Sequence, residues 1–209
     1  MDVTAAVRST GDRLADDAMA VAFRSLLANG EPVSADSLAA ELGASREEVD
    51  EAIDVLDRKG EIRRDDEGRL VAVLGLSVVP TEHVVSLGDR TVWTWCAKVA
   101  LGVLGTAEAD GRVESRCAET GRPVTLEFEG HRPRPSDVAV FWPSSEYASS
   151  CTSAREQLCT NINFFESEAA AEVWTARKDL PGEVLPVAEA TKRSIVWARE
   201  LGAMGGGSS

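Results

Sequence analysis

The stretch SADSLAAELGASREEVDEAIDVLDRKGEIRRDDEGRLVAVLGLSVV, residues 34–79, decides the fold of the N-terminal part of this chain. Ser34 stands where a capping residue opens a short helix with one apolar face. Ser45 and Glu48 form the capping-box pattern that opens a second, longer helix. Two strand-like runs then flank a turn at residues 66–68, which predicts a β-hairpin.

An upstream segment completes the pattern. Residues 12–28 place apolar side chains at helical spacing, and Asn29-Gly30 end this helix. Three helices followed by a hairpin predict a winged helix-turn-helix over residues 10–80. We expect a winged-helix-like domain at residues 1–80, with its boundary at Pro80.

The charge of this domain argues against nucleic acid as a partner. The segment that would enter the major groove, Arg46 to Lys59, carries six acidic residues against three basic ones. Each acid there opposes binding to phosphates. The three wing arginines are largely cancelled by the acids at 65–67. We therefore expect the winged helix to serve packing.

Composition limits the other classes. The chain has 209 residues, a formal net charge of −13 and a pI of about 4.6, so its surface repels phosphate backbones and anionic lipids. No apolar run approaches the roughly 18 residues that span a bilayer, and the N-terminus lacks the apolar block of a signal peptide. We expect a cytoplasmic protein with no membrane partner.

The four cysteines, Cys96, Cys117, Cys151 and Cys159, are then expected to be thiols. No C-x-x-C pair exists and only two histidines are present, which disfavours a zinc finger or ribbon. Free cysteines are often simply small core residues. Cys96 lies between an aromatic strand and an apolar helix, and a helix N-terminus there would favour a thiolate. Cys159 precedes a predicted strand at 161–165.

The C-terminal part reads as short strands and amphipathic helices. A hairpin over residues 111–129 is followed by a strand near 138–142 and by helices near 167–178 and 191–204. The predicted fold class is α+β, with the winged helix packed on a small mixed β-sheet domain with helices. That second domain is expected at residues 81–204, and Gly205 to Ser209 form a flexible tail.

Three motifs carry a family resemblance: WCA at 95–97, SRCAETGRPV at 115–124 and LCTNINFF at 158–165. Together and in this order they resemble the bacterial organomercurial (alkylmercury) lyases, which also begin with a winged-helix segment. The resemblance implies cleavage of carbon–mercury bonds. It implies that Cys96 and Cys159 bind mercury as catalytic thiolates, because soft thiolates prefer this metal, and that Cys117 is structural.

The resemblance also implies the partners. The substrate is a small organomercurial, mercury is substrate and product rather than a resident cofactor, and small thiols or a mercuric reductase accept the released Hg(II). Cys151 matches none of the family's cysteines, and its serine-rich setting predicts an exposed loop thiol.

One position departs from the family. Its proton-donating aspartate, three residues after the first cysteine, is Val99 here, and valine has no proton to give. Lys98 is expected to point about 100° away around the helix. Glu108 or Asp110 could fold back, or a cysteine thiol could release the proton on binding mercury and pass it to the carbon through water.

Three functions therefore stay open. The first is an organomercurial lyase, slow if the acid is lost. The second is a lyase-fold relative without protonolysis that binds a soft metal or does other thiol chemistry. The third is a winged-helix, metal-responsive DNA-binding regulator, against which the acidic third helix counts.

Overall fold

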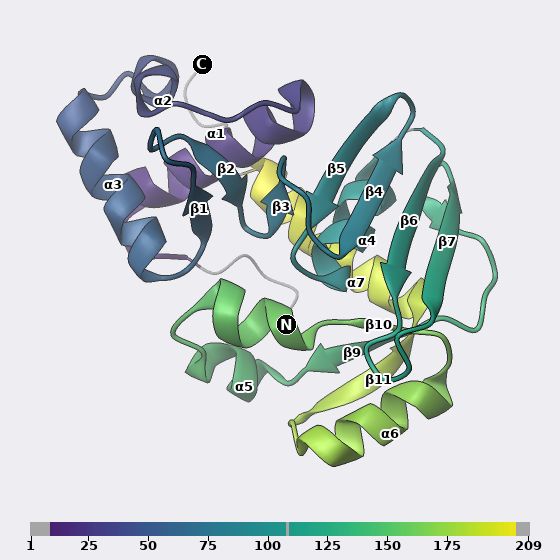
Figure 1. The fold of residues 1–209 in the computed structure, drawn as a ribbon. Helices are drawn as coiled ribbons and strands as arrows, with labels where there is room; N and C mark the ends of the chain where they lie inside the picture. The colour runs from purple at the N-terminus through teal and green to yellow at the C-terminus, as the bar shows by residue number, and fades with distance from the viewer. Residues whose placement is uncertain (1–8, 108, 204–209) are drawn as a thin grey trace.

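The computed structural model describes residues 9–107 and 109–203 (Figure 1). Its N-terminal part contains three helices, each opened by a side-chain cap from the residue before it: α1 (Arg13–Asn29), α2 (Ala35–Leu42) and α3 (Arg46–Arg58). The capping box of Ser45 and Glu48 is present as predicted. Their apolar faces meet in a common core.

The wing follows α3 and consists of β1 (Ile62–Arg64), β2 (Leu70–Val73) and β3 (Leu76–Ser77). The predicted hairpin is confirmed, but its second run is divided at Leu74-Gly75, where both residues have positive φ. This turn sends β3 beside β5, so the wing is continuous with the sheet of the C-terminal part.

The strands form two sheets in which every described pairing is antiparallel. The larger has the order β1-β2-β3-β5-β4-β6-β7-β8, and the smaller has the order β10-β9-β11. The remaining strands are β4 (His83–Leu87), β5 (Arg90–Thr94), β6 (Gly111–Arg116), β7 (Pro123–Glu129), β8 (Arg132–Pro133), β9 (Ala139–Pro143), β10 (Phe164–Phe165) and β11 (Gly182–Pro186). The α+β class with an N-terminal helix-turn-helix is confirmed, but the described sheets are antiparallel rather than mixed and are more extensive than expected.

Two helices cross behind the larger sheet, α4 (Ala97–Thr106) and α7 (Val187–Ala203) (Figure 1). They approach closely because α4 carries glycine at the contact. A Cβ on Gly105 would lie 2.6 Å from Cγ1 of Ile195. The shorter helices α5 (Ser145–Ser150) and α6 (Glu168–Lys178) accompany the smaller sheet.

The segment around Cys159 is helical rather than extended. A π-helical turn at Ala154–Leu158 leads into a 3-10 turn at Cys159–Asn161, and only Phe164–Phe165 pairs as a strand. The strand predicted for 161–165 is therefore wrong over its first half.

The described residues contain no helix long and apolar enough to cross a membrane. The predicted tail at 205–209 and the possible acid Glu108 lie outside them. One buried core runs through both halves of the chain, from Leu56 of α3 through Leu76 of the wing to Leu101 of α4.

Candidate functional site

Cys96 lies at the start of α4, as the sequence indicated. Its backbone is extended (φ −156°, ψ 161°), and the helix begins at the next residue. Thr94 Oγ1 donates a hydrogen bond to the Cys96 carbonyl (3.1 Å), which fixes the passage from β5 into the helix. The backbone amides of Lys98 and Val99 donate to the Cys96 sulfur, so the first N–H groups of the helix are directed at a buried thiol.

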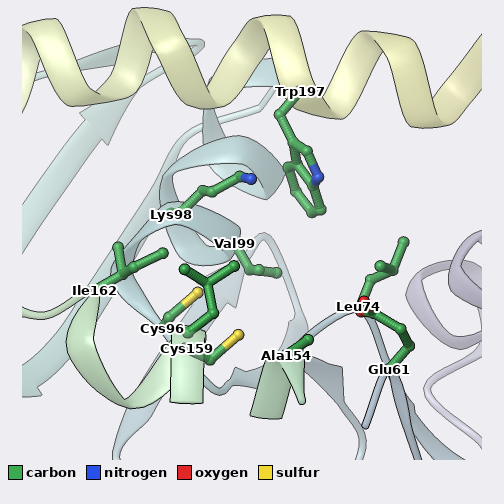
Figure 2. A pocket seen from close by; sticks show the side chains of 10 residues that line it. Glu61, Leu74, Cys96, Lys98, Val99, Ala154, Cys159, Ile162 and Trp197 are labelled. Carbon is green, nitrogen blue, oxygen red and sulfur yellow. The ribbon is translucent and has the colours of Figure 1, made fainter. Parts of the chain in front are cut away.

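Cys159 reaches the same place from a different part of the chain. Its amide donates to the carbonyl of Ala154, which closes the π-helical turn. Three residues later the chain is attached to α4, because the Ala97 amide donates to the Ile162 carbonyl (2.9 Å). These two anchors hold Cys159 beside Cys96 (Figure 2).

The two thiols form a hydrogen-bonded pair whose pKa values shift in opposite directions. The hydrogen bond from Cys159 lowers the pKa of Cys96, and the amides and the Lys98 charge lower it further against the effect of burial. The same hydrogen bond raises the pKa of Cys159, as do burial and the nearby charges of Cys96 and Glu61. Of the two thiols, Cys96 is therefore the more acidic and Cys159 the less acidic.

Both thiols open into a cavity of about 40 Å³. Its lining is mainly apolar with two charged side chains, and consists of Glu61, Leu74, Cys96, Lys98, Val99, Ala154, Leu158, Cys159, Ile162 and Trp197 (Figure 2). This volume suffices for a few water molecules or a small group.

Val99 lies in this lining, and its side chain is buried. The position of the absent aspartate therefore faces the thiols but presents only methyl groups. Lys98, expected to point away, also lines the cavity, with its Nζ 5.0 Å from the centroid of the Trp197 ring. The cavity extends from the thiols up to α7, so Lys98 lines it while its side chain extends toward Trp197 (Figure 2).

The sequence reading missed Glu61, which is only 3% exposed. It lies between α3 and β1, and its side chain enters the cavity from the side opposite the cysteines (Figure 2). A local sequence signal is lacking, because only the docking of the wing against the Cys159 segment makes this position internal.

The other candidates lie elsewhere. Asp110 Oδ1 accepts a hydrogen bond from the Gly130 amide (2.8 Å) and lines a separate hollow, so it does not fold back onto the thiols. Cys151 is buried and donates to the Tyr147 carbonyl (3.3 Å). The prediction that Cys151 is exposed was wrong. Its side chain points into the protein although the segment after α5 is polar.

Cys117 is buried in the loop between β6 and β7, away from the cavity lining. Its amide donates to the Arg122 carbonyl, and the Gly121 amide donates to the Cys117 carbonyl, both at 2.8 Å. Burial raises the pKa of the Cys117 thiol, but hydrogen bonds from Thr120 and from backbone amides outweigh it and lower that pKa overall.

Residues 76–199 match the family model for alkylmercury lyase. The chain belongs to the alkylmercury lyase family. Residues 4–74 match the helix-turn-helix domain of the same family, which places the winged helix within the shared architecture.

Relatives in the alkylmercury lyase family cover most of the chain. The alkylmercury lyase of Staphylococcus epidermidis is 32% identical over 85% of this chain and 78% of its own length. The alkylmercury lyase of Pseudomonas putida is 30% identical over 84% of this chain and 80% of its own length. The crystal structure of the mercury-bound form of MerB2 superposes with a TM-score of 0.74 over 90% of this chain and 98% of its own. At 23% identity it shows the common fold.

Proposed function

We propose that this chain cleaves the carbon–mercury bond of small organomercurials, with Cys96 and Cys159 as its catalytic thiols and mercury ligands. The observation that carries the proposal is the buried, hydrogen-bonded pair of thiols facing one cavity. Two soft sulfur atoms on one face are suited to hold one mercury atom. Family membership supports the same activity.

The first step is capture. The Cys96 thiolate attacks the mercury of R–Hg–X, forms the S–Hg bond and displaces X⁻, which for a thiol-bound organomercurial is a small thiolate. The helix N-terminus and the Lys98 ammonium stabilise the thiolate before attack.

The second step activates the carbon. Cys159 gives up its proton and binds the same mercury, and two sulfur ligands push electron density onto the carbon. A proton then adds to the carbon, the Hg–C bond breaks, and the hydrocarbon leaves while Hg(II) stays as a dithiolate. Hg remains Hg(II) throughout, so the reaction needs no oxidant and no resident cofactor.

Product release requires further thiols, since the dithiolate is stable. Small thiols or a mercuric reductase accept the Hg(II) in this scheme, and a reducing cytoplasm would keep both cysteines available. The buried loop position of Cys117 supports a structural role for that thiol.

The second candidate function is binding of mercury or another soft metal without cleavage. Val99 supports it, because this position in the cavity lining cannot donate a proton. The DNA-binding regulator is disfavoured. Arg64 of the wing pairs with Asp54 and Asp57 of α3, so this cation is already neutralised within the domain. Arg46, at the start of α3, pairs likewise with two aspartates.

Methane release from methylmercury under excess small thiol tests the proposal. We expect catalytic release by the wild type and none above background for Cys159→Ser, while Cys151→Ser remains close to wild type. Stoichiometric binding of methylmercury without any methane would refute cleavage and establish the binding-only function.

A further inference from the structure

We propose that Glu61, a residue of the winged-helix segment, donates the proton that cleaves the carbon–mercury bond in this chain. This inference rests on the proposed function, and it supplies the acid that residue 99 lacks. Glu61 is the carboxylic acid in the lining of the thiol cavity.

Its placement suits a proton donor. The thiols lie on one side of the cavity and the Glu61 side chain enters from the other, with Val99 bordering the space between them (Figure 2). A mercury atom held by two sulfurs directs its third bond away from them, towards that opposite side. The mercury-bound carbon then lies next to the side of the cavity that Glu61 lines.

The described geometry does not place Glu61 as a third mercury ligand. Within residues 9–107 and 109–203, no three histidine, cysteine, aspartate or glutamate side chains are close enough to hold one metal ion. Glu61 still lies within electrostatic range of the pair, because its charge is among the causes that raise the pKa of Cys159, after the hydrogen bond to Cys96. In the proposed step Glu61 reaches the reacting carbon directly or through one water, as a general acid must.

The proton that is transferred to the carbon comes from Cys159, so no other reactant is needed. The Glu61 carboxylate takes the proton of the Cys159 thiol as that sulfur binds mercury. The resulting carboxylic acid gives the same proton to the carbon, the Hg–C bond breaks, and R–H leaves. Glu61 returns to carboxylate, and Hg(II) remains on the two thiolates.

The backbone around Glu61 is fixed to both halves of the site. The Glu61 amide donates to the Leu56 carbonyl of α3 (3.0 Å), and its carbonyl accepts from the Leu74 amide (2.7 Å). The preceding Gly60 carbonyl accepts from the Arg155 amide in the π-helical turn that leads to Cys159 (3.1 Å). A carboxyl 3% exposed is costly to bury, and functional sites are where proteins accept that cost.

The winged helix thereby takes part in the chemistry. The domain that resembles a DNA reader supplies the acid, and its wing supplies Leu74 to the same cavity. Lys98 has a different task, since its positive charge favours the Cys96 thiolate that starts the reaction.

The test compares Glu61→Gln with wild type in single-turnover methane release from bound methylmercury. We expect Glu61→Gln to bind methylmercury stoichiometrically and to release methane 10²- to 10⁴-fold more slowly, the usual effect of losing a placed acid. Glu61→Asp should retain part of the rate. Glu67→Gln, which makes the same change at an exposed wing residue, should behave as wild type.

A rescue variant separates the acid from a structural role. Glu61→Gln combined with Val99→Asp places a carboxyl on the other wall of the cavity. This double variant should release methane at least tenfold faster than Glu61→Gln alone. Equal rates for wild type and Glu61→Gln would overturn the inference alone. Loss of methylmercury binding together with methane release, without rescue, would assign Glu61 a structural role and also overturn it. A wild type that releases no methane would overturn the proposed function and this inference with it.

Discussion

Gly60 lies directly against Ser153, so that a Cβ atom added to Gly60 would stand 2.2 Å from the Ser153 Oγ. Gly60 also has a left-handed backbone conformation (φ +64°). Its contact joins the end of α3 to the turn that carries Cys159. The winged helix therefore packs against the thiol site at Gly60, where only glycine fits.

Gly60→Ala should destabilise the protein by about 1–3 kcal/mol from backbone strain, with a further cost from the contact with Ser153. It should also slow methane release, because Glu61 and Cys159 are displaced relative to each other. Chemical denaturation and the methane assay measure the two effects.

Gly68→Ala is the matched control. Gly68 is also left-handed (φ +78°), but nothing lies within 4 Å of its would-be Cβ. Gly68→Ala should lose only the stability that backbone strain costs, and it should release methane at the wild-type rate. Equal effects of the two alanines on stability and activity would contradict the proposed coupling.

Removing either thiol of the pair should abolish tight retention of Hg(II). Two sulfurs on one metal act as a chelate, whose second bond forms at high effective concentration. Cys96→Ser and Cys159→Ser should each lower Hg(II) retention against a competing small thiol by about 10²-fold or more.

Cys117→Ser and Cys151→Ser serve as controls for the thiol pair. Both thiols are buried outside the predicted mercury site, so each variant should retain Hg(II) like wild type once its folding is verified. Loss of retention in either of these variants, with the pair variants unaffected, would show that the site assignment is wrong.

His83 should make the fold sensitive to acid. Burial lowers its pKa from 6.5 to about 4, and its Nδ1 lies 2.7 Å from Ser115 Oγ. The unfolded chain therefore binds a proton at a higher pH than the folded one. Stability from this residue is complete above pH 6.5 and is lost as the pH falls through about 4, by up to roughly 3 kcal/mol.

The measurement is the unfolding free energy between pH 7 and 4 for wild type, His83→Asn and His131→Gln. The exposed His131 makes its variant a control with the wild-type slope, whereas His83→Asn should be less stable at pH 7 and have a shallower slope. Parallel curves for all three proteins would contradict a neutral, buried His83.

DNA binding should be absent. Three cations of the wing and α3, Arg46, Arg64 and Arg69, are engaged in ion pairs with aspartates, and the chain carries a formal net charge of −13. A filter or gel assay at about 50 mM salt is the most permissive condition. Micromolar retention of a random duplex would favour the regulator instead.

The sequence predicted the elements whose signals are local. Ser45 and Glu48 are three residues apart and cap their helix as expected, and the turn at 66–68 joins the two strands of the wing. The position of Cys96 at the start of α4 also followed from adjacent residues.

The remaining features depend on distant contacts. The π-helical turn before Cys159 is held by Ser153, which caps it, and by Gln157, whose Oε1 accepts from the Thr152 amide (2.7 Å). Such side-chain bonds override the strand suggested by the apolar residues that follow. Glu61 lines the cavity only because β3 pairs with β5 and brings the wing across the site.

Cys96 and Cys159 are proposed to cleave the carbon–mercury bond together and to keep the metal. The most direct test of this proposal is a single turnover of wild-type protein with one equivalent of methylmercury and no added thiol, followed by methane quantification and X-ray absorption at the mercury edge. We expect one methane per chain and a product with two sulfur ligands and no carbon ligand, and neither result in Cys96→Ser. Mercury that retains its carbon on the wild-type protein, with no methane released, would contradict the proposal.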